Sequence, residues 1–349
     1  MADKVILTGA AGFVGSHVLA YLLDHTDWEI VCPVTFTHKG VPARLVMAMT
    51  EGANALNTER MKRVYIQMVD LTAPVDHITL GVWEGAKYIF NVASDSHVDR
   101  SITEPRRAIM NNVALMTTML DAARIVKPDM FIQMSTDEVY GPAAEGYASR
   151  EWDAILPSNP YSASKAAQEA IAFSYWRTYD VPVVITNTMN IIGERQDAEK
   201  FLPRVVKGLL TKTPIPVHTD ENGIAGSRMY LHAMNLADAW LWITQNVKPI
   251  KYSEEGVHRP RRINVVGERE IANDELVYEI GAHLDMSRKR IDQLKLVNRV
   301  DFHGSRPGHD RRYALDGAYM SALGWDPPLP LNDALGRVTR WYRAYDTWL

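Results

Sequence analysis

Two short motifs in the middle of the chain carry side chains that could perform acid–base chemistry. The first is Ser135–Glu138, which follows the apolar run Met130–Met134. Such a run predicts a buried parallel strand, and in open α/β sheets the chemistry gathers just beyond the carboxyl ends of the strands. The second motif pairs Tyr161 with Lys165, whose spacing predicts two side chains one turn apart on the same face of a helix. Both motifs are therefore candidates for one active site.

The residue types in these motifs suit proton transfer. A phenol has a pKa of about 10 and is a poor base at neutral pH, but a nearby ammonium group favours the phenolate. Lys165 could do this for Tyr161. Two adjacent carboxyl groups, Asp137 and Glu138, can differ in protonation because burial and like-charge repulsion raise the pKa of one of them. Alone, either motif could be a solvated helix face or an acidic turn. A cofactor site elsewhere in the chain favours the catalytic interpretation.

A glycine-rich turn near the N-terminus predicts that cofactor site. Lys4–Thr8 is typical of a short buried strand, Gly9, Gly12 and Gly15 follow it, and a helix is expected over Ser16–Leu23. Between a strand and a helix, such glycines allow a tight turn and close approach of a pyrophosphate, which the unpaired N–H groups of the helix then face. The residues expected to bind a dinucleotide are Gly9, Gly12, Phe13, Val14 and Gly15 of the turn, Asp70, Leu71, Ala93 and Ser94 at the ends of later strands, and Asn112, Tyr161 and Lys165.

The end of the second expected strand, Glu29–Val34, departs from the usual pattern. Dinucleotide sites usually place an Asp or Glu there to hydrogen-bond the adenosine ribose. Here the strand continues into Thr35-Phe36-Thr37-His38-Lys39, which contains no acid. The sequence therefore leaves NAD and NADP both open, because Lys39 or Arg44 could bind a 2′-phosphate.

The order of strands and helices predicts an α/β fold with a Rossmann-type, doubly wound parallel sheet. We expect residues 1–188 to form the cofactor-binding domain, with 231–267 returning to it. Residues 189–230 and 268–349 should form a smaller substrate-binding domain, with only short elements in 190–230 and a helical cap over 268–349. The strands are expected at Lys4–Thr8, Glu29–Val34, Val64–Val69, Tyr88–Val92, Met130–Met134, Val181–Thr186 and Arg262–Val266, and the longer helices at Glu104–Val126, Tyr161–Tyr179 and Asn235–Asn246.

Composition narrows the class of partner. A net charge of −4 and 46% hydrophobic residues are ordinary for a globular protein and give no reason to expect nucleic acid or an anionic membrane as a partner. No apolar stretch approaches the roughly 20 residues that a membrane-spanning helix needs. The single cysteine, Cys32, cannot form an intramolecular disulfide, and with no evident signal peptide we expect a cytoplasmic location. No metal site is expected, since Met110, Met116 and Met119 fit a helix stripe.

Taken in order, these segments resemble the extended short-chain dehydrogenase/reductases over nearly the whole chain. Within that superfamily the sequence is most similar to the dTDP-glucose 4,6-dehydratases. The glycine turn and the Tyr-x-x-x-Lys pair are shared by the whole superfamily, whereas the Thr136–Glu138 triplet distinguishes the dehydratases. The matching segments are Gly9–Gly15, Ser96–Ser101, Ser135–Gly141, Tyr161–Lys165 and Arg306–Tyr313.

The resemblance implies a role for each of five catalytic residues in a nucleotide-hexose 4,6-dehydratase whose nicotinamide is reduced and re-oxidised in one turnover. Tyr161 would take the proton of the sugar 4-hydroxyl, and Thr136 would hydrogen-bond the same oxygen. Lys165 would support Tyr161 and hold the nicotinamide ribose. Glu138 would remove the C5 proton, and a protonated Asp137 would donate to the departing 6-hydroxyl.

The resemblance also implies a nucleotide-diphosphate sugar as substrate. Arg228 and Arg306 align with phosphate-binding arginines, and His218 stands where the family commonly has a tyrosine that packs on the base. His309 could contact the diphosphate or the base, or cap a loop. The implied substrate-binding residues are Ser96, His97, Asn190, Lys200, His218, Arg228, Asn264, Arg306 and His309.

Several alternatives stay open at this point. Departures from the family fall on the nucleotide and sugar side, so UDP- or CDP-sugars or an N-acetylated hexose are possible substrates. A 5,6-dehydration, a C4 epimerisation or a decarboxylation would use the same 4-keto intermediate. A protein of another class, a non-catalytic NAD-binding sensor, could share the fold. The family also implies a homodimer, in which the helices starting near Glu104 and Pro160 pair with their copies in a four-helix bundle.

Overall fold

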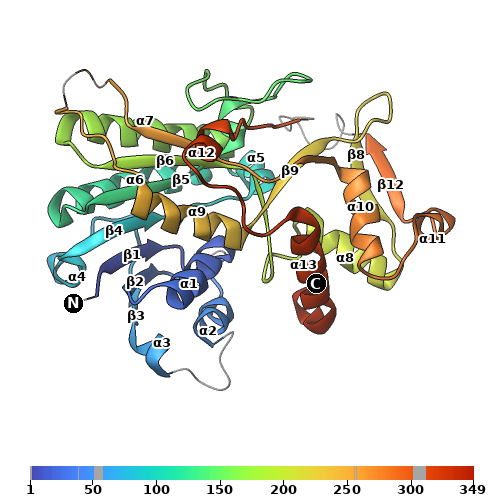
Figure 1. The fold of residues 1–349 in the computed structure, drawn as a ribbon, viewed down its shortest axis with the longest axis horizontal. Coiled ribbons are helices and arrows are strands. Elements are labelled where there is room, and N and C mark those ends of the chain that lie inside the picture. The colour runs from blue at the N-terminus through green and yellow to red at the C-terminus, as the bar shows by residue number, and fades with distance from the viewer. Residues whose placement is uncertain (1, 38, 51–57, 255, 257, 302–311) are drawn as a thin grey trace.

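A seven-stranded parallel sheet forms the centre of the molecule, in the strand order β10-β6-β5-β4-β1-β2-β3 (Figure 1). It is seen in a computed structural model, which describes residues 2–37, 39–50, 58–254, 256, 258–301 and 312–349. The strands are β1 (Lys4–Thr8), β2 (Glu29–Val34), β3 (Val64–Met68), β4 (Ala86–Asn91), β5 (Met130–Thr136), β6 (Val183–Thr188) and β10 (Arg261–Val265).

Helices cover both faces of this sheet, and the strand side chains alternate between them. In β1, Val5 and Leu7 pack in one core with α1 (Phe13–His25) and α9 (Ala233–Asn246). Ile6 points the other way and packs with α6 (Pro105–Val126) and α7 (Pro160–Tyr179). This two-sided burial explains why the strands have nearly continuous apolar sequences. The shorter helices between the strands are α2 (Pro42–Thr50), α3 (Thr58–Lys62), α4 (His77–Trp83) and α5 (Val98–Thr103), and the 3₁₀ turn η1 (Asp137–Tyr140) follows β5.

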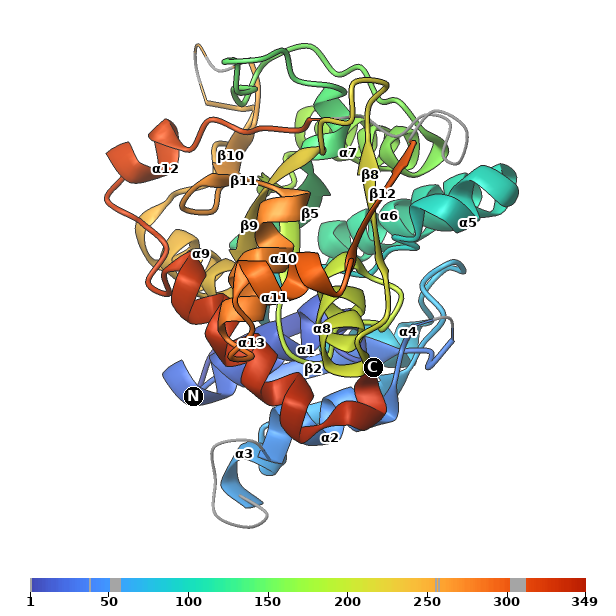
Figure 2. The same ribbon diagram turned by 90° about the vertical axis from the view of Figure 1, so that its right-hand side faces the viewer.

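The elements of the C-terminal half that do not join this sheet lie mostly to one side of it and have a hydrophobic core of their own (Figures 1 and 2). They include a three-stranded sheet, β11-β9-β7, and a parallel pair, β12-β8. The strands are β7 (Asn190–Ile192), β8 (Ile215–Thr219), β9 (Ser227–His232), β11 (Glu270–Ala272) and β12 (Val297–Asp301). The helices are α8 (Phe201–Thr211), α10 (Asn273–Ala282), α11 (Arg288–Gln293) and α13 (Leu331–Ala344), with the 3₁₀ turn η2 (Asp346–Trp348) at the end. Helix α12 (Ala318–Ala322) instead packs on β10 of the central sheet.

The expected doubly wound parallel sheet is confirmed, whereas the expectation for the remaining segments is incomplete. Residues 190–230 contain α8, a helix of 11 residues, instead of short elements alone. Residues 268–349 contain β11 and β12 as well as helices. Each of these strands is short and pairs with a strand distant in sequence, so that no local pattern marks it. The division into two domains stays a prediction, although β10 does pair with β6 in the central sheet.

Cys32 is fully buried in β2, and burial raises the pKa of its thiol to about 12, so the thiol is unreactive. Within the described residues, no group of three or more His, Cys, Asp or Glu side chains is placed to hold a metal ion. In the same part of the chain, no helix is both long enough and apolar enough to cross a lipid bilayer.

Candidate active site

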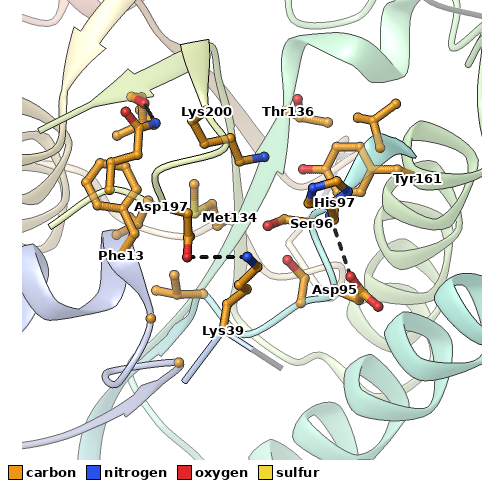
Figure 3. A pocket seen from close by; sticks show the side chains of 18 of the residues that line it. Phe13, Lys39, Asp95, Ser96, His97, Met134, Thr136, Tyr161, Asp197 and Lys200 are labelled. Atoms are coloured by element: carbon orange, nitrogen blue, oxygen red, sulfur yellow. Dashed lines mark hydrogen bonds and ion pairs between the residues drawn. The ribbon is translucent and has the colours of Figure 1, made fainter. Parts of the chain in front are cut away.

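A cavity of about 1140 Å³ lies at the carboxyl ends of the central strands. It is lined by the glycine turn after β1, by residues after β2, β3 and β4, by the end of β5 and by the start of α7. Residues 188–204 and parts of 216–230 line it from the other side. Figure 3 shows Tyr161 and His97 on one side of this cavity and Phe13 on the other. Cavities for single small ligands measure about 300–1,000 Å³, so this one has room for a cofactor and a substrate together.

The glycine turn is packed too closely against backbone to accept side chains. Gly9 has a φ of 71°, and the Gly12 N–H donates to the Gly9 carbonyl over 2.8 Å. A Cβ added to Gly15 would lie 2.1 Å from that same carbonyl oxygen. Helix α1 begins at Phe13, and no side chain caps its N-terminus. Its first N–H groups are thus available to a phosphate, which fits the expected dinucleotide.

Replacing Gly15 with alanine should disrupt this turn. The new Cβ would clash with backbone, so we expect the free energy of unfolding to fall by about 2–3 kcal/mol and NAD binding to weaken at least about tenfold. Gly81→Ala in α4 is the matched control, because an added Cβ there meets nothing within 4 Å. The control should keep cofactor affinity. Urea unfolding and cofactor titration measure both effects, and wild-type affinity in Gly15→Ala would contradict this account of the turn.

The other expected cofactor residues divide into two groups. Asp70, Leu71, Ala93 and Ser94 line the cavity. Asn112 is instead fully buried in α6, where its amide accepts from the Asp95 N–H over 2.7 Å and donates to the Asp95 carbonyl over 3.0 Å. The structure therefore assigns Asn112 to holding the loop after β4, not to the cavity wall.

The triplet at the end of β5 is connected to the start of α7. The Thr136 hydroxyl donates to Asp137 Oδ1 over 3.0 Å, and Asn159 Nδ2 donates to Glu138 Oε2 over 3.1 Å. Asn159 is also the N-cap of α7, where its Oδ1 accepts from the Ser162 N–H. This residue thereby fixes Glu138 relative to the helix that carries the tyrosine. Sequence reasoning missed Asn159, although an asparagine before a proline at a helix start signals a cap.

Asp137 is suited to carry a proton. Burial, and after it the Glu138 carboxylate, raise the pKa of Asp137 to about 7, against the opposing effects of Thr136 and Arg228. Its Oδ2 atom is buried and has no hydrogen-bond partner within the described part of the chain. A buried polar atom left without a partner is uncommon. It is consistent with a carboxyl group that donates its proton to a ligand.

Tyr161 and Lys165 lie on α7 as the spacing predicts, but they do not affect each other as expected. Burial, followed by the Glu138 and Asp137 carboxylates, raises the pKa of Tyr161, while a hydrogen bond with Thr136 lowers it. Burial lowers the pKa of Lys165 to about 7. The Lys165 ammonium donates to the Met134 carbonyl and to the side chain of the next-turn glutamine, each over 2.7 Å. That glutamine, Gln168, was not expected at the site.

The expected substrate residues are brought together only in part. Arg228 is a mostly buried residue of the cavity wall, and its guanidinium lies 4.8 Å from the centre of the Tyr313 ring. Asn264 does not line the cavity, because its buried amide donates to the carbonyls of Ser149 and Asp316. Those that line the cavity are Ser96, His97, Asn190, Lys200, His218 and Arg228, while Arg306 and His309 lie outside the described residues.

The chain is similar to known proteins over nearly its whole length. The model of the NAD dependent epimerase/dehydratase family matches residues 5–257. The chain is 31% identical to the low-salt glycan biosynthesis protein Agl12 of Haloferax volcanii, over 98% of this chain and 99% of that protein. It is 30% identical to a dTDP-glucose 4,6-dehydratase of Xanthomonas campestris, over 99% of this chain and 94% of that protein. Among solved structures, DesIV, a dTDP-glucose 4,6-dehydratase from Streptomyces venezuelae with NAD and TYD bound, superimposes with a TM-score of 0.81 at 28% identity, covering 99% of this chain and 98% of that one.

Proposed function

The chain belongs to the NAD dependent epimerase/dehydratase family, and within it we propose a nucleotide-hexose 4,6-dehydratase that converts a dTDP-glucose-like substrate to a 4-keto-6-deoxy sugar. The observation that carries the proposal is the pair of carboxyl groups beside Tyr161. Burial and the neighbouring Glu138 carboxylate raise the pKa of Asp137 to about 7, and its Oδ2 atom has no hydrogen-bond partner within the described residues. Glu138 is next to it in the same cavity. A dehydration needs such a pair, one group to take a proton and one to give it.

NAD is the cofactor of this site. The glycine turn and the uncapped N-terminus of α1 fit its pyrophosphate. NAD is bound in the related DesIV structure. When bound, NAD supplies the hydride acceptor for C4 and, through its positive charge, favours the ionised form of Tyr161.

Tyr161 is proposed to remove the proton of the sugar 4-hydroxyl. Thr136 hydrogen-bonds Tyr161 and lowers its pKa against the larger effect of burial. We also assign Thr136 to hydrogen-bonding the reacting sugar oxygen. Lys165 lines the cavity behind Tyr161, where its ammonium is held by Met134 and Gln168. We assign Lys165 to binding the nicotinamide ribose and to supplying positive charge.

The two carboxyl groups are proposed to carry out the elimination. A 4-keto group acidifies the C5 proton, which Glu138 removes. Asp137 in its protonated form donates to the 6-hydroxyl, which leaves as water. The 4-keto-6-deoxy product would then form when the hydride taken from C4 is returned to C6 and a proton is returned to C5. The hydrogen bond from Asn159 keeps the Glu138 carboxylate oriented, whereas Asp137 Oδ2 has no hydrogen-bond partner within the described residues. Their unequal roles then follow from unequal surroundings.

The far side of the cavity is proposed to bind the nucleotide diphosphate. Arg228 and Lys200 provide positive charge there, and arginine suits the geometry of a phosphate. We assign His218 to packing against the base, and Asn190, Ser96 and His97, which line the same cavity, to contacts with the substrate.

Incubation of the purified protein with dTDP-glucose, UDP-glucose, CDP-glucose and UDP-N-acetylglucosamine, each with NAD, tests the proposed reaction. Mass spectrometry should show loss of one water from one of these substrates with no net formation of NADH. An isomer of unchanged mass would identify an epimerase instead. No reaction with any of the four would overturn the proposed substrate class.

The rate of water loss, the step in which Asp137 gives its proton, should fall as the pH rises through about 7. Asp137 acts in its protonated form, and its pKa is about 7, so the competent fraction declines above that value. Lys165, with a pKa lowered to about 7, loses its positive charge over the same range, which acts in the same direction. The single-turnover rate of water loss between pH 6 and pH 9 measures this decline, because ionisation of Tyr161 favours the earlier oxidation at C4 and does not enter this step. A rate of water loss that rises steadily over that range would contradict these roles.

The homodimer stays a prediction. Helices α6 and α7 pack side by side, and Met110, Ile125 and Tyr179 on them are exposed. A four-helix bundle between two copies would cover side chains of this kind. Sedimentation showing only monomer at micromolar concentration would refute it.

A further inference from the structure

The loop after β2 lacks the carboxylate that normally meets the adenosine ribose, and another element brings one to it. Thr35 and Thr37 follow the strand, with their hydroxyl oxygens 2.7 Å apart. The Val41 N–H donates to the Ala11 carbonyl, which fixes the loop against the glycine turn. The loop therefore lines the cofactor end of the cavity without contributing an acidic side chain of its own.

Two carboxylates reach this loop from the segment just before α8. Asp197 Oδ1 lies 3.6 Å from Lys39 Nζ and 3.2 Å from Arg44 Nη2. Glu199 Oε1 lies 2.9 Å from the same Lys39 nitrogen. Figure 3 shows the ion pair between Asp197 and Lys39 in the middle of the cavity.

The segment that carries Asp197 is itself anchored on the cofactor side. Arg44 Nε donates to the Arg195 carbonyl over 2.9 Å. A Cβ added to Gly193 would lie 3.1 Å from the His17 ring and 3.2 Å from the Phe13 ring, so this segment packs closely on the start of α1. The position of Asp197 is therefore set by packing and not by one exposed ion pair.

Both cations that could bind a 2′-phosphate are occupied by this arrangement. Arg44 is 1% exposed, and its remaining donor, Nη1, is bound to the Lys39 carbonyl over 2.6 Å. Lys39 is half exposed and is the cation that a cofactor could reach, but two carboxylates neutralise it. A 2′-phosphate arriving here would compete with Glu199 and Asp197 for Lys39 and with Asp197 for Arg44, and it would be repelled by the carboxylate charge.

We propose that Asp197 selects NAD over NADP in this chain, in place of the missing acid at the end of β2. It places a negative charge beside the cofactor loop and holds Lys39 and Arg44 away from a 2′-phosphate. The proposal rests on the assignment of NAD to the cavity but not on the dehydratase reaction. A failed test of the sugar reaction would leave it intact.

Titration of the purified full-length protein with NAD and with NADP, by isothermal calorimetry, tests this role without any turnover. Wild type should bind NAD at least about tenfold more tightly than NADP. Asp197→Asn keeps the shape and removes the charge, so NADP affinity should rise about fivefold while NAD affinity changes less than about twofold. Glu221→Gln, an exposed carboxylate of the loop after β8, is the matched control and should change neither affinity. An unchanged NADP-to-NAD ratio in Asp197→Asn would overturn the proposal.

Lys39→Ala supplies a second test, and its arm in the wild-type background does not depend on the folding of Asp197→Asn. In the wild-type background it should change NADP affinity less than about twofold, because Lys39 is already paired. In the Asp197→Asn background it should remove the gain in NADP affinity. Loss of about tenfold or more of NADP affinity in Lys39→Ala alone would show that Lys39 is not neutralised, which would overturn the proposal.

Discussion

Replacing Tyr161 with phenylalanine should lower kcat by about three orders of magnitude, which is within the usual contribution of general acid–base catalysis. The phenol is the group proposed to take the proton from the sugar 4-hydroxyl. Removing one oxygen from a side chain that lines the cavity leaves the ring and the start of α7 unchanged. NAD affinity should therefore stay within about twofold. Steady-state kinetics with the substrate found in the mass-spectrometric test, together with NAD titration, measure the two effects.

Tyr175→Phe is the matched control for this variant. Tyr175 lies on the same helix, and its hydroxyl donates to Asp121 at the surface, away from the cavity. It should keep wild-type kcat. If Tyr161→Phe retained more than about a tenth of the wild-type rate, another group would have to be the base, and the assignment of Tyr161 would fail.

Asp137→Asn and Glu138→Gln should each lower the rate of water loss by about two to three orders of magnitude. Both substitutions keep the size of the side chain and remove its ability to transfer a proton. Glu138→Gln leaves Tyr161 in place, so oxidation at C4 should still take place and the absorbance of reduced cofactor should accumulate. Stopped-flow absorbance and mass spectrometry of the sugar separate these two stages.

Glu145→Gln is the matched control for the carboxylates, because Glu145 is exposed and does not line the cavity. It should react at the wild-type rate. Full turnover by both Asp137→Asn and Glu138→Gln would show that the 4,6-dehydratase assignment is wrong. Loss of activity in Asp137→Asn alone would assign both proton transfers to one carboxyl group.

Local patterns were sufficient to predict the cofactor turn and to select the proposed catalytic residues. Glycines between a strand and a helix predict a tight turn, and here Gly9 takes a φ of 71° while Gly15, in α1, packs closely on the Gly9 carbonyl. The spacing of Tyr161 and Lys165 places them on one helix because a helix repeats every 3.6 residues or so. The alternation of apolar strands and helices was likewise sufficient to predict the parallel sheet.

The partners of individual side chains were decided only by the tertiary structure. Asn112 and Asn264 match the family pattern, yet both are buried and bind neighbouring backbone instead of lining the cavity. Their amides could not be assigned from sequence because a buried amide binds whichever groups packing brings to it. For the same reason, the Lys165 ammonium lies against Met134 and Gln168, and the expected lowering of the pKa of Tyr161 by Lys165 is not what the site shows.

The fold class, the family resemblance and the candidate reacting groups could all be predicted from the sequence, because each depends on short patterns of residue type and spacing. Tertiary structure decided the protonation of those groups, since burial next to Glu138 is what raises the pKa of Asp137 to about 7. The tertiary structure also determines which carboxylates pair with Lys39 and Arg44. Asp197, which pairs with both, lies more than 150 residues further along the chain and meets them only when the segment before α8 packs on the cofactor side. An ion pair between such distant residues leaves no local pattern in the sequence.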